Sequence, residues 1–595
     1  MKRGFLIFLI FFSFLSAIAQ KVKPTKKVIP VKLRDTVKTE VVEVITTYNP
    51  KIADANKIKK NPTLQLGDNN KKKKLAYNIF SAPVASTFIP KTGIVKGIDV
   101  GVRERIFDNY VAAGFGNYAS PYAEAYIRKY TRFHSEFGLS AKYKASLDNI
   151  ENTRLDSDFS NFLTSLFYKK EERYFDWKVV LDTEGNGYNW YGLKQDTFSD
   201  LILDNIQEKQ TYNFFNIQGE IDFLDAYIDR SNLSLSYFTD AYSSNELLIN
   251  FHTDLDLPLN FISRNLNNLQ VKTSLELLTG QFENDYANQN ELNYSIFTAK
   301  VNPEYSTTFS GFSLKLGTKI FASFDAENST NNFLVYPDIK IQKAIIKEKL
   351  NVYGGVLGDF HTNTYKNFTD ENPYISPTQF ITQTAERYNA FLGFNGIISN
   401  YFSFNISASI KEEQDKILLV RNNSKSNGTS NFLNGNELRG FEYGNSFSVI
   451  YDDVKTTSIF AELEYDLTKK MTVSANIQFD DFQMTRQSEA WNLPSFQTAI
   501  VGAFKSYKWY ATTNVFYIGE RKDVLYGAAF PSGTNGIQNL NSYIDANLNG
   551  GYHFNNRFSA FFKFNNILNT NYQRFANFNV QGFQALGGII YKFDF

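Results

Sequence analysis

The stretch MTVSANIQFD, residues 471–480, alternates apolar and polar side chains at every position. The odd-numbered positions hold Met471, Val473, Ala475, Ile477 and Phe479, and the even-numbered positions hold only hydroxyl, amide and carboxyl side chains. Successive side chains of a β-strand point to opposite faces of its sheet. The stretch therefore predicts a strand with one apolar face and one polar face.

The segment just before it repeats the pattern. Residues 459–467 place Ile, Ala, Leu, Tyr and Leu opposite Phe, Glu, Glu and Asp, and Thr468-Lys469-Lys470 separates the two segments. We therefore predict a β-hairpin over 459–480. The same alternation recurs at 136–144, 232–238, 400–410 and 557–564, and in GGIIYKFDF at the C-terminus, residues 587–595.

The connections between these segments differ in length. Several are short polar turns, whereas others are long and rich in Asn, Asp, Ser and Gly, roughly at 145–160, 186–209, 362–384, 421–440, 521–538 and 569–582. Short turns that alternate with long loops are typical of bacterial outer-membrane barrels. The sequence predicts an all-β fold, a transmembrane antiparallel outer-membrane β-barrel of about 22 strands over residues 91–595. Whether 440–467 holds one strand or two is the main uncertainty in a count of 22 to 24.

The composition agrees with a wide barrel. Aromatic residues make up 16% of the chain, with 56 Phe and 36 Tyr, and both strands and membrane interfaces favour them. The mean hydropathy is −0.33, which a barrel with a wet interior explains because half of each strand is polar. A soluble propeller or sandwich array does not explain one face that stays apolar in strand after strand.

The N-terminus is organised for export. Lys2 and Arg3 precede an apolar run from Phe5 to about Leu15 and an Ala17-Ile18-Ala19 site, which predicts a cleaved signal peptide over residues 1–19. The next part, 20–90, is a basic leader: residues 21–80 hold 15 Lys or Arg against 5 Asp or Glu, a net charge of +10. With few aromatic residues it buries little apolar area, so we predict a largely extended periplasmic segment.

The C-terminal region, NNILNTNYQRFANFNVQGFQALGGIIYKFDF at 565–595, resembles the end of TonB-dependent outer-membrane receptors. Asn566-Ile567-Leu568-Asn569 with Tyr572 fill one element of the family pattern, and Gly587 with the terminal aromatics fills the other. The resemblance implies that Tyr591, Phe593 and Phe595 form the signal that the outer-membrane assembly machinery recognises. It also implies outer-membrane lipid, and TonB or another periplasmic protein, as partners.

The N-terminal region departs from this family. Members carry a plug of well over a hundred residues inside the barrel, whereas here about 70 residues separate the signal peptide from the first strand expected near Thr92. EVVEVITTYNP at 40–50 resembles the region where such a plug begins, so the leader is either a reduced plug or a TonB-box-like segment. The box-like residues are Val41, Val42, Glu43, Val44, Ile45 and Thr46, and an extended segment of this kind suits strand addition to a partner sheet.

Residues for catalysis or metal binding are sparse. The chain has no Cys, and its four His, at 134, 252, 361 and 553, lie far apart in the sequence. Adjacent carboxylates such as Asp452-Asp453 point to opposite faces of a strand, so they do not form an acid–base pair. No phosphate-cradling loop or nucleophile motif is present. We predict that the protein is not an enzyme, and expect no cofactor, metal or nucleic-acid partner.

Three functions remain open from the sequence. The first is a receptor or transporter of the Gram-negative outer membrane that binds or imports a ligand. The second is a passive porin-like pore, which requires the lumen to stay open although a wide unplugged barrel would breach the membrane barrier. The third is a structural or assembly-partner barrel that uses its basic leader as a contact. We favour the receptor or transporter, with the ligand unidentified.

Overall fold

The structure is a computed structural model that describes residues 107–595 apart from 195–196, 225, 265, 288–289, 400 and 528–532. The signal peptide, the basic leader and residues 91–106 lie outside the described residues. Within the described part, strands dominate and helices are limited to two short segments in loops, α2 (Asp200–Leu203) and α3 (Tyr365–Glu371). Neither helix is long and apolar enough to cross a membrane.

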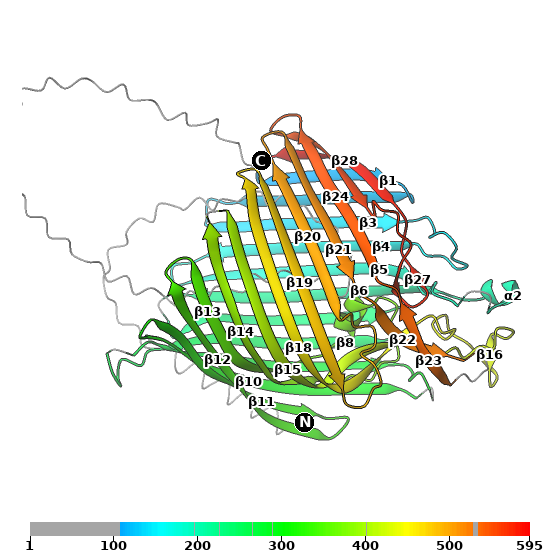
Figure 1. The fold of residues 1–595 in the computed structure, drawn as a ribbon, viewed down its shortest axis with the longest axis horizontal. Coiled ribbons are helices and arrows are strands. Elements are labelled where there is room, and N and C mark those ends of the chain that lie inside the picture. The colour runs from blue at the N-terminus through cyan, green and yellow to red at the C-terminus, as the bar shows by residue number, and fades with distance from the viewer. Residues whose placement is uncertain are drawn as a thin grey trace, which may run out of the picture. The chain divides into compact units, whose positions relative to one another are not determined.

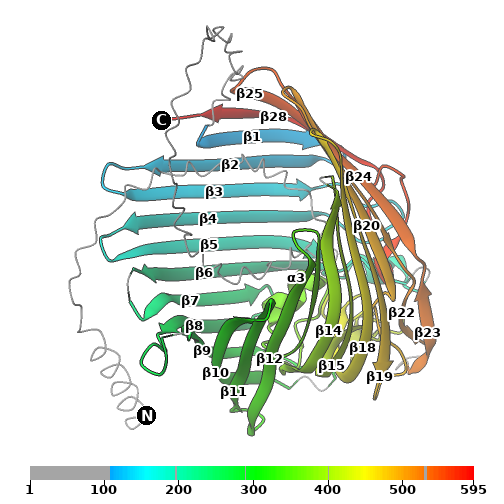
Figure 2. The ribbon, with the colours of Figure 1, turned by 60° about the vertical axis from the view of Figure 1, so that its left-hand side comes forward.

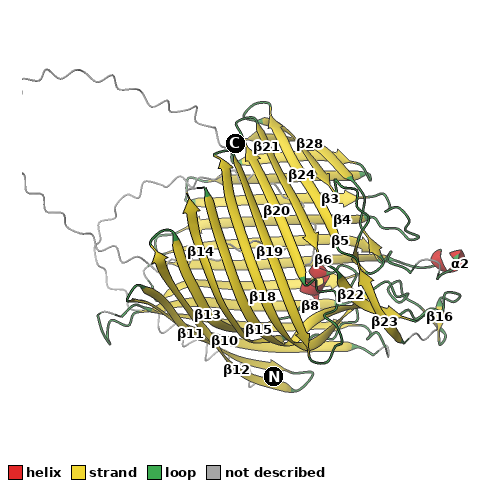
Figure 3. Cartoon of the chain, in the orientation of Figure 1, coloured by secondary structure: helices red, strands yellow, loops and turns green. Residues whose placement is uncertain are grey.

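A single antiparallel sheet of 22 strands forms the body of the molecule, as Figures 1 and 3 show. Its strands are β1 (Asn109–Gly116), β2 (Ser120–Tyr130), β3 (Ser135–Ser146), β4 (Phe159–Glu171), β5 (Phe175–Asn189), β6 (Lys209–Phe223), β7 (Ile228–Asp240), β8 (Asn245–Leu257), β9 (Leu269–Phe282), β10 (Leu292–Phe309), β11 (Phe312–Asp325), β12 (Thr330–Ile346), β13 (Leu350–His361), β14 (Thr384–Ser399), β15 (Phe402–Arg421), β18 (Phe447–Thr468), β19 (Met471–Met484), β20 (Phe496–Lys505), β21 (Trp509–Ile518), β24 (Tyr543–His553), β25 (Phe558–Asn565) and β28 (Gln584–Phe593).

The sheet closes on itself. Each strand pairs with its sequence neighbours in the sheet, and β1 pairs with both β2 and β28, so no strand edge is left unpaired. Gly114 lies opposite Gly588 at this seam. A Cβ atom at Gly588 would stand 2.3 Å from the Ala113 carbonyl oxygen and 2.4 Å from the Phe561 ring, so this inner surface has room only for glycine. The predicted barrel of about 22 strands is confirmed.

The hairpin predicted over 459–480 forms between β18 and β19. Ile459 pairs with Phe479 and Ala461 with Ile477, which places the apolar residues of both strands on one face. That face is outward: the exposed fractions of Ile459, Ile477 and Phe479 are 55%, 42% and 47%. Large apolar side chains exposed around a closed sheet match the lipid-facing band of an outer-membrane barrel. The region 440–467 contributes one long strand, β18, which settles the count at 22.

The two ends of the barrel differ. At the turn end, which holds the start of β1 and the end of β28, connections such as 172–174, 310–311, 469–470 and 554–557 are short. At the loop end lie the long connections 147–158, 190–208, 362–383, 422–446, 485–495, 519–542 and 566–583. All of them except 485–495 lie close to loops predicted from the sequence. Figure 2 shows the C-terminus beside the turns and α3 at the opposite, loop end.

Three of the loops carry small hairpins of their own. These are β16 (Phe432–Leu433) with β17 (Asn436–Glu437), β22 (Arg521–Tyr526) with β23 (Thr534–Leu540), and β26 (Gln573–Phe575) with β27 (Phe578–Asn579). The long loops are therefore folded structures, and their own hydrogen bonds hold their shapes.

Candidate functional site in the loop-end mouth of the barrel

The loop-end loops pack together into an apolar core. Buried residues from 190–208, 362–383, 422–446 and 566–583 join inward-facing residues of strands β6 to β10 in one cluster. Trp190, Tyr365, Phe447 and Phe578 are each at most 1% exposed. Burial of such large aromatic side chains stabilises the arrangement substantially, at about 1.5–3 kcal/mol for each. We call this assembly the loop plug.

Helix α3 lies inside the barrel mouth and is held by a carboxylate of the wall. The Thr364 side chain caps the helix by accepting a hydrogen bond from the Asn367 amide, 3.0 Å away. The amides of Tyr365 and Lys366 both donate to the carboxylate of Glu246 on β8, at 2.7 and 3.1 Å. The first amides of a helix lack partners within the helix and favour negative charge, so Glu246 fixes the position of α3.

A second carboxylate binds the side chain of the same helix. The Tyr365 hydroxyl donates to Asp240 Oδ2 at 2.8 Å, and Asp240 Oδ1 accepts the amides of Tyr242 and Ser244 at 2.8 and 2.9 Å. Burial raises the pKa of Tyr365 well above its ordinary value, so the phenol stays neutral and remains a donor. Asp240 thereby connects the 241–244 turn to α3.

Lys366 completes the attachment of α3. Its Nζ lies 3.1 Å from Glu184 Oε2 on β5 and 2.7 Å from Asp370 Oδ1 within the helix, and it stands over the Phe214 ring at 5.0 Å. Glu184 and Glu246 belong to different parts of the wall, so α3 bridges β5 and β8 across the inner surface of the barrel.

Loops from distant parts of the wall meet in the loop plug. Tyr374 and Phe578 stack with ring centroids 3.8 Å apart, and the Tyr191 hydroxyl donates to the Asn579 carbonyl at 2.8 Å. The Asn445 side chain donates to the Trp190 carbonyl at 2.6 Å. The aromatic segment at 188–192 is therefore used for packing between loops and is not presented to solvent.

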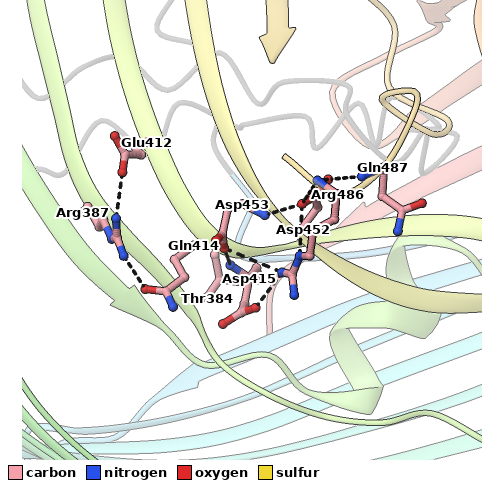
Figure 4. Close-up of polar contacts among 9 residues, drawn as sticks. All are labelled: Thr384, Arg387, Glu412, Gln414, Asp415, Asp452, Asp453, Arg486 and Gln487. Carbon is pink, nitrogen blue, oxygen red and sulfur yellow. Dashed lines mark hydrogen bonds and ion pairs between the residues drawn. The ribbon is translucent and has the colours of Figure 1, made fainter. Parts of the chain in front are cut away.

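A polar network attaches the 485–495 loop to the rim, as Figure 4 shows. The amides of Arg486 and Gln487 donate to the carboxylate of Asp452 at 2.9 and 2.7 Å, and the Arg486 guanidinium also donates to Asp452 and Asp415 at 3.3 and 3.2 Å. These bonds raise the pKa of Arg486. Asp415 has a φ of 52° at a bulge of β15, and its amide donates to Asp453.

A smaller contact lies beside this network in Figure 4. Arg387 on β14 donates to Glu412 Oε1 at 3.0 Å and to Gln414 Oε1 at 3.1 Å on β15. These pairs are largely exposed, and exposed ion pairs stabilise a fold by at most about 1 kcal/mol. They connect β14 to β15 at the rim.

Below the loop plug, the barrel wall is polar and rich in ion pairs. Lys315 Nζ lies 2.9 Å from Glu304 and 3.3 Å from Asp338, and Lys319 Nζ lies 2.5 Å from Asp359. These residues occupy the inward positions of β10 to β13, opposite to the exposed apolar side chains of the same strands. The inner surface is thus wet, as the alternation of the sequence predicts.

The C-terminal aromatics form a ladder on the closing strand. The rings of Tyr591 and Phe558 lie 4.8 Å apart, and those of Phe593 and Phe595 lie 5.4 Å apart. Phe595 is 75% exposed at the turn end. Their role as an assembly signal remains a prediction. The box-like residues Val41 to Thr46 lie outside the described residues.

The geometry offers little for catalysis. His361 Nε2 lies 3.7 Å from Glu386, His252 Nε2 lies 3.0 Å from Asp254, and His553 Nδ1 lies 2.7 Å from the Ser559 hydroxyl. Among those residues, no group of three or more His, Asp or Glu side chains is arranged to hold a metal ion. Asp452 binds loop amides, and its neighbour Asp453 accepts the Asp415 amide and lies 3.7 Å from the Arg486 guanidinium, so both carboxylates belong to the rim network.

Sequence reasoning missed the residues that hold the loop plug. Asp240 and Glu246 flank a short polar turn, and Tyr365 lies in a long loop, more than a hundred residues away. Nothing in the local pattern pairs them. The only available indication was the aromatic content of the long loops, such as YNWYG at 188–192, which is high for solvated segments.

Comparisons with known proteins agree with this architecture at the level of structure. No protein-family model matches the sequence, and no curated protein matches it significantly. Solved structures do match. The siderophore receptor PirA from Acinetobacter baumannii aligns with a TM-score of 0.59 at 10% identity, covering 82% of this chain and 80% of its own. The FrpB iron transporter from Neisseria meningitidis gives 0.60 at 8% identity, covering 82% of each chain.

A third solved structure, the pyoverdine receptor FpvA from Pseudomonas aeruginosa bound to pyoverdine, gives a TM-score of 0.57 at 11% identity and covers 82% of this chain and 79% of its own. Their descriptions name a siderophore receptor, an iron transporter and a pyoverdine outer-membrane receptor. At these identities the likeness concerns the fold. The chain has the 22-stranded outer-membrane barrel fold of TonB-dependent siderophore receptors, as the C-terminal resemblance predicts.

Proposed function

We propose that this protein is a receptor or transporter of the Gram-negative outer membrane that binds a ligand at the loop end and moves it inward. The observation that carries the proposal is the loop plug: a barrel of receptor size whose mouth holds its own packed loops. A barrel that only admits small solutes needs an open path. Loops joined by Tyr374 and Phe578, and by Asn445 and Trp190, instead suit a gated path.

We propose ferric siderophores as the ligand class, since the structural neighbours are described as siderophore receptors or an iron transporter. Two of the four Trp, Trp190 and Trp491, lie in loop-end loops and are buried, so their fluorescence reports on these loops. Titration of the purified mature chain with ferric enterobactin and ferric pyoverdine should quench this fluorescence saturably. No response, together with no ligand-dependent uptake in reconstituted cells, would exclude this ligand class.

We propose that residues 1–19 are removed on export and that Val41 to Thr46, in the leader 20–90, pair with the sheet edge of TonB or another periplasmic protein. A central proline removes the amide that strand addition uses. Val44→Pro should therefore abolish uptake while leaving ligand binding unchanged, whereas Val44→Thr should retain uptake. Equal uptake by both variants would assign the leader another role, such as the structural contact of an assembly-partner barrel.

We also propose that Tyr591, Phe593 and Phe595 direct insertion by the outer-membrane assembly machinery. Deletion of Phe595 should lower the amount of barrel that reaches the outer membrane, measured by heat-dependent gel mobility of membrane fractions. Ile590→Val, an inward change on the same strand, is the matched control. If the deletion variant and the control reached the outer membrane in equal amounts, Phe595 would not direct insertion.

A further inference from the structure

Two arginines lie where three loop-end loops meet. Arg521, at the start of β22, donates through Nη2 to the Gln573 carbonyl at 2.8 Å and through Nη1 to the Arg574 carbonyl. Arg574, in β26, donates through Nη2 to the Glu371 carbonyl at 3.1 Å. The guanidinium groups therefore join the loops 519–542, 566–583 and 362–383, the last of which carries α3.

The bonding of these arginines is incomplete. Arg521 is only 5% exposed, yet its Nε has no hydrogen-bond partner, and the Nε of Arg574 is likewise buried without one. Neither guanidinium forms an ion pair with any residue in the described part of the chain. Carbonyl oxygens satisfy donors but do not neutralise a buried charge, and buried charges are normally paired. Burial lowers the pKa of Arg521, and the neighbouring charge of Arg574 lowers it further.

The surrounding groups compensate the positive charge only in part, since Tyr543, Tyr572 and Asp523 raise the pKa of Arg521 against the effect of burial. Tyr543 and Tyr572 stack with centroids 3.9 Å apart, and the Arg521 guanidinium stands 5.2 Å from the Tyr543 ring. The Tyr572 hydroxyl donates to Asp545 Oδ2 at 2.8 Å.

The other carboxylate near Arg521 belongs to Asp523. Its Oδ1 accepts the amides of Arg421 and Val524 at 3.2 and 2.8 Å, and its Oδ2 has no hydrogen-bond partner. Both carboxylates are thus engaged in part by other groups, and neither lies within ion-pair distance of Arg521 or Arg574.

We propose that Arg521 and Arg574 bind an oxyanion group, a carboxylate or phosphate, of the ligand that enters from the loop end. Guanidinium forks match such groups in shape and charge. Arg574, which is half-buried, forms the accessible side, and the enclosed Nε atoms are donors that no protein group uses. That the anion belongs to a transported ligand rests on the proposed function. Since Arg574 also holds the α3 loop, occupation of this site couples ligand binding to the loop plug.

The test uses the full mature chain in detergent with inorganic phosphate and, separately, malonate as probes, against chloride at equal ionic strength. The fluorescence of Trp491 reports on the site, because Trp491 is buried beside Val524, three residues after Arg521. The next residue, Asn492, donates its amide to the carbonyl of Lys522, which directly follows Arg521. The other three Trp are replaced by Phe. A saturable fluorescence change is expected with at least one probe, and the tighter probe names the anion class. Arg574→Gln should weaken binding about tenfold or more, and Arg574→Lys less.

Arg486→Gln is the matched control, because Arg486 lies on the neighbouring loop but is already paired with Asp452 and Asp415. It should titrate like the parent. An absent response in the parent, or equal binding by Arg574→Gln and the parent, would overturn the proposal. A purely structural arginine would lower the melting temperature of the loop end without changing the anion titration. Anion binding without ferric-siderophore binding would retain the site and refute the proposed ligand class.

Discussion

At the scale of single residues, the alternation of β19 separates lipid from lumen. Ile477 is 42% exposed on the outer face, and Ser474 faces inward opposite Glu464. Ile477→Arg places a charge in lipid, at a cost of about 2–4 kcal/mol near the midplane, so the assembled fraction should fall. Ser474→Arg is the control and should assemble normally beside the Glu464 carboxylate. Heat-dependent gel mobility measures both. If Ile477→Arg assembled and Ser474→Arg did not, the assignment of outward and inward faces on β19 would be wrong.

The burial of Asp523 predicts that the stability of the loop end depends on pH. Its side chain is fully buried, and burial raises its pKa above the ordinary value. Because the pKa of Asp523 is higher in the folded state, its protonated form favours the folded loops. The stability that Asp523 contributes is fully present below the unfolded pKa of about 3.9. It is lost as the pH rises through the folded pKa. Asp523→Asn should raise the melting temperature of the loop end more at pH 7 than at pH 4. Trp491 fluorescence would measure this, and an equal effect at both pH values would contradict it.

At the scale of elements, α3 and its loop form the removable part of the loop plug. The anchors of α3 include two amides on Glu246 and one hydroxyl on Asp240, on neighbouring strands, and Lys366 on Glu184. Replacement of 364–381 by a short Gly-Ser linker removes these bonds and the buried Tyr365 and Phe368. In planar bilayers, we expect the variant to conduct strongly while the parent conducts little.

The hairpin β16–β17 provides the matched control for that experiment. Its residues 432–437 are largely exposed, and it projects from the loop end in Figure 1. Its replacement by the same linker should leave the conductance unchanged. If both variants conduct equally little, other loops close the mouth; if the parent already conducts as strongly as the α3 variant, the barrel is an open pore.

At the scale of the whole molecule, we expect the loops to close the barrel. Among the described residues, the loop core joins segments from 150 to 578. Removal of residues 21–90 should therefore leave the conductance of the mature chain low. A large conductance after this removal alone would show that the leader closes the lumen.

The sequence determined the barrel, because its strands are specified locally. The alternation in stretches such as 471–480 can be recognised without reference to distant residues, because the polarity of each side chain depends only on whether it faces lipid or the lumen. The long loops were also visible from composition, and their observed bounds differ by a few residues. The sequence leaves open whether 440–467 holds one strand or two, because Tyr, Asp and Ser in this region are compatible with both a strand interior and the end of a loop.

Only the tertiary structure decided what the loops do. Glu246 with Tyr365, Trp190 with Asn445, and Arg521 with Arg574 are pairs from separate loops and strands, and no short-range pattern links their members. Their contacts arise because closure of the 22 strands brings the loop ends around one mouth. There, apolar loop side chains are buried more favourably against one another than in water, and buried polar groups must find partners. The sequence by itself determined a barrel, and the fold decided that its loops pack together in its mouth.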